Sequence, residues 1–577
     1  MESSSLLGNL RNRARVRERV KSFFNPAAFD PTSFRHTVQM AMLGLVLGEI
    51  SVFILLKQSA RVGELPNYIT DVLIIGISAV EFILGPLIGW LGSQRRRNIM
   101  VGWVVVALAC MLPVFGVPKP EAEVDTALCN VWRTLPAGIT PMAALRLSIL
   151  ILVGISCALT RLAIMTHALA YLEESNPSMN LHMNIAVLLL VRIVLLLVGT
   201  TMLSSMMDSL AWLQFLMIVV KLIITIVRLY KYPVVPPTMD IRHGADRGFF
   251  RSVGRVLRSK MAVLQILAMS LLAAALWGFG SQEADFAKFK FHVVPGTGMI
   301  WEWGAPLRAL FIIMGVILAG YLYTNPVMPV LDKKAAILNA GRMTIYCVIL
   351  FAVMTAALNC SKGEVAGLEE TTYSQPFCAL GCGCDRPWTQ FDPVCATEHM
   401  TTFYSPCHAG CATATTIGNL AVYTNCTCSP NGHVTVGACG DNSCTAAYSL
   451  HTLMFAAATL AGTLAFVWQI TIMLEAVDRR DKSVALGIAS GTVSLFAFVG
   501  AHGVYVAIGA YSCALFRGQV CLFQNSNFVP RVGYTSIGLA GASLIITIIA
   551  YIVQYRQIKS EENEKKKEIE DVDLSRE

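Results

Sequence analysis

Charged side chains stand inside several long apolar stretches of this sequence. Arg161, Arg192 and Arg308 are each surrounded by aliphatic residues, and the stretch AVLLLVRIVLLLVG leaves Arg192 without a polar neighbour. A charge at the centre of a bilayer costs roughly 2.5–3.5 kcal/mol on insertion scales, so such a residue needs a polar cavity or a partner. A guanidinium group binds sulfate, sulfonate and carboxylate oxygens through forked hydrogen bonds. The three arginines, with His502, are therefore candidate residues for binding the charged group of an anion.

Acidic residues in similar apolar surroundings offer the alternative. Glu49 and Glu81 could pair with the arginines and make them structural, or could take part in ion coupling together with His167. The sequence leaves both roles open, because nothing in it shows which helices are neighbours.

The composition indicates what holds these charges. Of 577 residues, 55% are hydrophobic and only 14% are charged, whereas soluble domains are about a quarter charged. A helix needs about 20 apolar residues to cross a bilayer. The sequence predicts twelve such helices and no cleavable signal peptide, with spans at 37–57, 70–92, 98–116, 144–171, 184–205, 211–229, 261–280, 303–323, 343–359, 449–474, 484–509 and 533–555.

Basic residues predict the orientation of these spans. The net charge of +8 is concentrated in loops such as GSQRRRN, DKKAAILNAGR and LEAVDRRDK, which alternate with loops poor in Lys and Arg. Basic loops stay in the cytoplasm, so both termini are expected there. The predicted organisation is a basic tail at 1–36, six-helix halves at 37–229 and 261–555, a basic linker at 230–260, an extracellular insertion at 360–448 and a cytoplasmic tail at 556–577.

Cysteines support the same topology. It places fourteen of the seventeen outside the membrane: Cys129, eleven between Cys360 and Cys444, and the pair Cys513 and Cys521. Disulfides persist in oxidising compartments. The predicted disulfide cysteines are Cys360, Cys378, Cys382, Cys384, Cys395, Cys407, Cys411, Cys426, Cys428, Cys439, Cys444, Cys513 and Cys521, in pairs that spacing alone does not decide. Asn359 and Asn425 stand in N-x-S/T sequons on the same side and are candidate glycosylation sites.

Several motifs in and after the insertion point to one family. CALGCGC at 378–384, DPVC at 392–395, SPCHAGC at 405–411 and KSVALG at 482–487 match its pattern. The chain resembles the organic anion transporting polypeptides, and the cysteine arrangement around Tyr404 also resembles a Kazal-type inhibitor fold. The resemblance implies the major facilitator plan, with two six-helix halves and a Kazal-like loop between helices 9 and 10. It is thin over the first 340 residues, so the chain is a divergent member by this comparison.

The resemblance also implies a function. An all-α membrane protein of this kind is expected to be a plasma-membrane secondary transporter, which moves amphipathic organic anions such as steroid sulfates or bile salts by alternating access. A carrier of zwitterions or cations, or a cell-surface interaction protein without transport activity, are the alternatives. The expected partners are an organic anion and the lipid bilayer, without nucleic acid. The chain is not expected to be an enzyme or to bind a metal or cofactor, since no catalytic constellation or GxxxxGK[ST] loop is present.

Overall fold

The computed structural model describes residues 30–61, 65–66, 68–92, 95–116, 140–175, 214–233, 248–293, 299–324, 333–360, 364–369, 372–384, 392–417, 420–439, 442–517 and 520–574. The predicted span 184–205, Arg192 and Cys129 lie outside these residues. Nine helices of the described part are long and apolar enough to cross a membrane. The chain is therefore a multi-pass membrane protein, and the exact number of twelve helices stays a prediction.

The first group of helices comes from the N-terminal half of the sequence. It contains α2 (Pro31–Arg61), α3 (Ile69–Trp90), α4 (Arg96–Met111) with the short 3₁₀ helix η1 (Leu112–Gly116), and α5 (Pro141–Ser175). Residues 214–229 are also helical. α2 packs along α5, and α5 also contacts α4.

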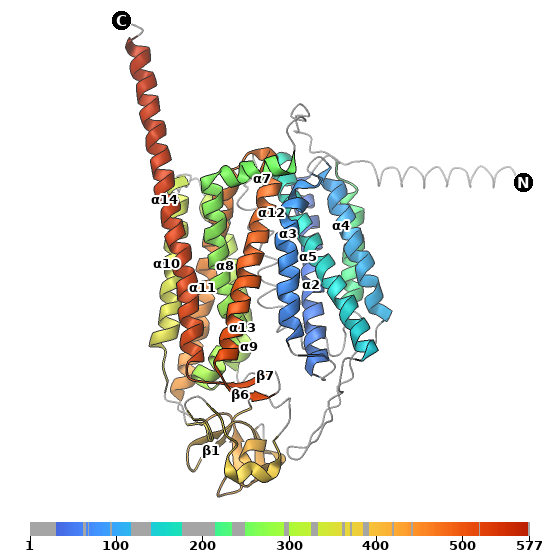
Figure 1. Cartoon of the computed structure of the whole chain (residues 1–577), viewed down its shortest axis with the longest axis vertical. Helices are drawn as coiled ribbons and strands as arrows, with labels where there is room; N and C mark the ends of the chain where they lie inside the picture. The colour runs from blue at the N-terminus through green and yellow to red at the C-terminus, as the bar shows by residue number, and fades with distance from the viewer. Residues whose placement is uncertain are drawn as a thin grey trace, which may run out of the picture.

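The second group contains the later helices. These are α8 (Lys260–Phe291), α9 (Met299–Thr324), α10 (Lys333–Ala352), α11 (Asn442–Glu475), α12 (Lys482–Val493), α13 (His502–Tyr511) and α14 (Phe528–Leu574). Two π-helical segments interrupt or extend them, η3 (Val353–Ala357) after α10 and η7 (Ser494–Ala501) between α12 and α13. The short helix α7 (Phe249–Arg258) lies across the end of the bundle between the two groups (Figure 1).

One predicted helix boundary is wrong in a way that matters. The span predicted at 261–280 continues as α8 to Phe291. The extra residues, SQEADFAKFKF, are polar on one side, but their phenylalanines pack into the apolar core beside Phe279. A run of consecutive apolar residues stops at Gly280, so the predicted span stopped there too. Glu283 was therefore predicted to lie outside the helix, whereas it belongs to α8.

The two groups meet where α3 lies against α12 and η7. A methyl group on Gly85 would lie 2.5 Å from the carbonyl oxygen of Gly487, and one on Gly89 would lie 2.3 Å from that of Ser483. The backbones therefore touch, as the Gly-x3-Gly spacing at Gly85 and at Gly487 predicts. No other residue type fits this contact without moving one helix.

A disulfide-rich module occupies the opposite end of the bundle from α7 (Figure 1). Its five strands are β1 (Val394–Ala396), β2 (Thr401–Phe403), β3 (Cys411–Ile417), β4 (Leu420–Cys426) and β5 (His433–Val436), arranged in the order β2-β1-β5-β4-β3 with antiparallel pairs. Two short 3₁₀ helices, η4 (Phe377–Cys382) and η5 (Cys407–Ala409), complete it. The sheet is small, so its stability must come largely from cross-links.

Six disulfides in the described residues hold this end of the protein together. They are Cys360–Cys444, Cys378–Cys428, Cys384–Cys407, Cys395–Cys439, Cys411–Cys426 and Cys513–Cys521. Cys382 is disulfide-bonded as well. Cys360–Cys444 closes the base of the module where it joins α11, so the module is tied to the second group of helices.

Aromatic contacts fix the module on the helices. The Tyr404 ring lies 5.8 Å from that of Phe523, which in turn lies 4.9 Å from Phe289 at the end of α8. Phe523 belongs to the hairpin β6 (Cys513–Arg517) and β7 (Val520–Gln524), and the backbone N–H of Tyr373 donates to the carbonyl oxygen of Ala514 in the same hairpin. The module and the last hairpin therefore form one structural unit.

Candidate functional site

A buried charge cluster joins three helices of the first group. Nε of Arg161, on α5, donates to Oε1 of Glu49, on α2, over 2.7 Å, and Nη2 of the same arginine bonds to Oε1 of Glu81, on α3. The side chains of Arg161, Glu49 and Glu81 are only 4%, 9% and 2% exposed. The structure thus brings together three residues that the sequence singled out separately, in the paired arrangement given above as the alternative to substrate binding.

This cluster retains a free donor and reaches the other group of helices. Nη1 of Arg161 is buried and has no hydrogen-bond partner. Ser494, in the π-helical segment η7, donates its hydroxyl to Oε2 of Glu81 over 2.6 Å. Glu81 therefore links the arginine of one half to a helix of the other.

A second polar contact joins the two groups of helices near the first turn of α3. Nε2 of His502, at the start of α13, lies 3.1 Å from Oδ1 of Asp71. His502 is 4% exposed, whereas the Asp71 side chain is 39% exposed. His502 was predicted as a substrate-binding residue, but its described neighbour is a carboxylate of the opposite half.

A second buried cluster lies in the later helices. Nη1 of Arg308, on α9, donates to Oε2 of Glu283, on α8, over 2.7 Å, and Nε2 of His451, on α11, lies 4.0 Å from Oε1 of Glu283. The Nε of Arg308 and both ring nitrogens of His451 are buried without a hydrogen-bond partner. Aromatic rings surround the cluster: Arg308 lies 5.3 Å from the centre of Phe455, and His451 stacks on Phe286 at 5.3 Å.

The three helices bring these side chains to a common depth. Glu283 stands eight residues before the end of α8, while Arg308 and His451 stand nine residues after the starts of their helices. At 1.5 Å per residue, each lies about 12–14 Å from the end of the bundle that carries the disulfide-rich module. An anion entering from that end would therefore meet Arg308 below the surface.

The remaining candidate residues have more local roles in the structure. Nε2 of His167 lies 2.9 Å from the carbonyl oxygen of Ile88 and is fully buried, so it donates its ring N–H to α3. Asn425 is exposed at the end of β4, and Asn359 is exposed just after η3, so both side chains are accessible for modification.

Sequence reasoning missed Glu283 and His451. Glu283 lies beyond the predicted end of its helix. His451 lies close to the start of the predicted span 449–474, where a polar side chain costs little free energy in a membrane and so does not stand out as a functional residue. Phe279 and Phe286 stand seven residues apart and therefore on one face of a helix, a spacing that indicates that the helix continues past the first polar residues.

The disulfide-rich module contains a buried histidine of its own. Nδ1 of His408 lies 2.8 Å from the Ser405 hydroxyl, and the ring contacts Tyr404 at 5.0 Å. Burial lowers the pKa of His408 to about 4 and raises the pKa of Asp392. Within the described residues, the sulfurs with metal-ligand spacing are those of Cys382, Cys384 and Cys407; all three belong to disulfide-bonded cysteines, which leaves no thiolate for an ion.

Comparisons with known proteins agree with the sequence resemblance. A family model described as the Organic Anion Transporter Polypeptide (OATP) family matches residues 211–527, more than half of the chain. The mouse solute carrier organic anion transporter family member 2B1 is 24% identical over 324 residues, which is 53% of this chain and 46% of that protein. The human member 1B3 is 24% identical over 358 residues, covering 55% of this chain and 49% of the relative. The chain thus matches about half the length of these curated relatives, which are named as transporters rather than enzymes.

Solved structures with a similar outline are more distant. The human organic anion transporter MFSD10 aligns with a TM-score of 0.43 at 10% identity, covering 90% of this chain and 99% of that one. The proton:xylose symporter XylE aligns with a TM-score of 0.49 at 12% identity, covering 91% and 96%.

Proposed function

We propose that this chain, which belongs to the Organic Anion Transporter Polypeptide family, is a secondary transporter that carries amphipathic organic anions across the plasma membrane by alternating access. Steroid sulfates and bile salts are the substrate classes that combine a large apolar body with one sulfate, sulfonate or carboxylate group. The two halves would rock about their contact, in the manner of major facilitator proteins.

The observation that carries this proposal is the state of two arginines inside the bundle, Arg161, which is buried, and Arg308, whose side chain is 12% exposed. Arg308 is held by one carboxylate, Glu283, and retains a buried Nε without a partner. Arg161, in the other group of helices, also retains a buried nitrogen without a partner, although two carboxylates, Glu49 and Glu81, already hold it. A buried N–H without an acceptor is unfavourable. An anionic oxygen would satisfy it, because a charge-assisted hydrogen bond is about twice as strong as a neutral one.

The contacts between the halves support alternating access. Backbones touch at Gly85 and Gly487, and two hydrogen bonds, from Ser494 to Glu81 and between His502 and Asp71, join α3 to η7 and α13, the elements that follow α12 in the chain. The first of these hydrogen bonds involves Glu81, which is itself a partner of Arg161. A substrate that alters the pairing of Arg161 with Glu81 would therefore also alter a contact between the halves.

The surroundings of Arg308 suit the apolar body of such a substrate. Phe286 and Phe455 pack around the cluster, and the disulfide-rich module covers the same end of the bundle. We infer that the module, with a Kazal-like cysteine pattern, is an extracellular cap that moves with the second half, to which Cys360–Cys444 and Phe523 attach it.

The proposal is tested by uptake of labelled estrone sulfate into cells at matched surface expression. Arg308→Gln should weaken apparent affinity roughly 10- to 100-fold, the equivalent of one lost charge-assisted hydrogen bond. The double variant with Glu283→Gln separates binding from folding: it removes the unpaired carboxylate but should not restore affinity. Arg342→Gln, an exposed arginine of α10, is the matched control.

If the double variant has the wild-type apparent affinity for estrone sulfate, Arg308 is not part of the binding site. Arg192 lies outside the described residues and remains a predicted substrate-binding residue: Arg192→Ala should lose affinity, and Arg192→Lys should recover only part of it, because an ammonium cannot reproduce the guanidinium fork.

A further inference from the structure

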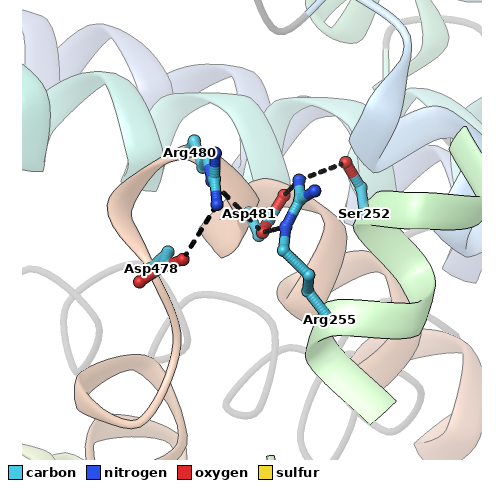
Figure 2. A network of polar contacts seen from close by, with 5 residues as sticks. All are labelled: Ser252, Arg255, Asp478, Arg480 and Asp481. Atoms are coloured by element: carbon cyan, nitrogen blue, oxygen red, sulfur yellow. Dashed lines mark hydrogen bonds and ion pairs between the residues drawn. The ribbon is translucent and has the colours of Figure 1, made fainter. Parts of the chain in front are cut away.

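The short helix α7 is anchored to both halves at the end of the bundle. Arg255 forms a forked pair with Asp481, with Nε to Oδ2 at 2.6 Å and Nη2 to Oδ1 at 2.8 Å, and its Nη2 also donates to the Ser252 hydroxyl (Figure 2). Phe249 packs edge-on against Trp90, the last residue of α3, at 5.8 Å. One side of α7 is thus fixed to α3 and to the start of α12.

The other side of α7 is both apolar and basic. Phe250 is 85% exposed and Leu257 is 55% exposed, and these residues stand seven positions apart on one face. Arg251 and Arg258, each one residue further on, are also exposed. Two large apolar side chains and two arginines therefore share a surface that the described residues do not cover.

The position of α7 places this surface at the membrane boundary. Ser259 alone separates the end of α7 at Arg258 from the start of the membrane-spanning helix α8 at Lys260. α7 also lies across the direction of the bundle helices at their ends (Figure 1). A helix in this position with an apolar and basic face matches the pattern of helices that lie in the bilayer interface.

We propose that Phe250, Leu257, Arg251 and Arg258 form a binding surface for anionic phospholipid. Phe250 and Leu257 enter the acyl-chain boundary, while the two arginines bind the phosphate and carboxylate of the headgroup. Because the opposite face of α7 contacts both halves through Trp90 and Asp481, bound lipid stabilises the arrangement in which α3 and α12 are in contact. Anionic lipid at this surface therefore favours closure of that end of the bundle.

The test uses the full chain carrying Phe250→Trp, reconstituted into vesicles in which either phosphatidylcholine or phosphatidylserine carries bromine near the headgroup. Subtracting the parent chain isolates the fluorescence of residue 250. We expect quenching by both lipids, with phosphatidylserine favoured. Changing Arg251 and Arg258 together to Gln should reduce that preference on the order of tenfold or more, because each basic residue near the surface adds to the attraction.

Two control variants show whether the quenching is specific to α7. Arg479→Gln combined with Arg556→Gln removes the same charge from exposed arginines outside α7 and should leave the preference unchanged. Phe377→Trp, an 89% exposed position on the disulfide-rich module, should not be quenched. Absence of quenching at residue 250, or equal quenching by both lipids, would overturn the proposal, and neither measurement depends on a transported substrate.

Discussion

Replacing Arg161 by leucine should strongly destabilise the protein. The change leaves Glu49 and Glu81 without their described arginine partner, at 7% and 2% residue exposure. Removing one member of a buried ion pair costs about 3–5 kcal/mol, since the charge of its partner stays buried. Arg161→Leu should therefore lower the free energy of unfolding by at least that amount.

Two further variants make this test specific. Combining Arg161→Leu with Glu49→Gln and Glu81→Gln removes both buried carboxylate charges and should recover most of the lost stability, because replacing a whole buried ionic cluster by uncharged residues often changes stability little. Arg480→Leu is the control: the buried Asp481, 3.9 Å from Arg480, keeps its forked pair with Arg255, and the nearer partner of Arg480 is Asp478 at 3.4 Å, with side chains 45% and 67% exposed. Such an exposed pair contributes about 0–1 kcal/mol.

The chain contains its own reporters for this measurement. Cys157 and Cys347 are free and buried in membrane-spanning helices, so a thiol-reactive dye labels them only as the helices separate. Denaturant titration of the purified protein in detergent then compares the variants. If Arg161→Leu is as stable as Arg480→Leu, or if the triple variant is less stable than Arg161→Leu, the cluster does not hold the helices as described.

Three other predictions follow from particular contacts. Gly487→Leu should push α3 and α12 apart, since even a methyl group at this position would lie 2.3 Å from the carbonyl oxygen of Gly85. Accessibility labelling should then show that the end of the bundle near α7 is more open. Gly503→Leu should not change the labelling, because Gly503 has open space around it. Cys395→Ala should destabilise the disulfide-rich module by about 2–5 kcal/mol and retain the protein inside the cell, measured by surface biotinylation against Cys110→Ala. Burial lowers the pKa of His408 to about 4, from the ordinary value of 6.5, so the unfolded module binds the proton more readily and the stability of the module should fall as the pH decreases from 6.5 towards 4. His408→Gln should flatten this pH dependence, measured by proteolysis of the module. An unchanged slope would assign the pH dependence to another group.

Many of the apolar helices were accessible from the sequence because burial in lipid imposes a simple requirement of length and apolarity. The spans at 70–92 and 303–323, each interrupted by a charge, are helices in the structure as predicted. The glycine spacing at Gly85 and Gly487 indicated close helix contact, which the structure confirms.

The partners of the charged residues were not accessible in the same way. Pairing of Arg161 with Glu49 and Glu81 depends on how α2, α3 and α5 are placed in three dimensions, and no local pattern contains that information. Glu283 was missed because α8 continues through a polar stretch, held there by aromatic packing from other helices. The contact between Ser494 and Glu81 joins residues 413 positions apart, a separation at which sequence periodicity says nothing.

Whether the chain transports amphipathic organic anions is decided by uptake into liposomes that contain the purified protein. Labelled estrone sulfate should enter vesicles containing the protein in a saturable manner, be inhibited by unlabelled taurocholate, and exceed uptake into empty vesicles, while tetraethylammonium should not accumulate. Saturable uptake of the cation without the anion would indicate a carrier of the opposite charge class. If neither compound is taken up saturably although Cys157 and Cys347 are protected from the thiol dye as in folded protein, the chain is not a transporter of organic anions.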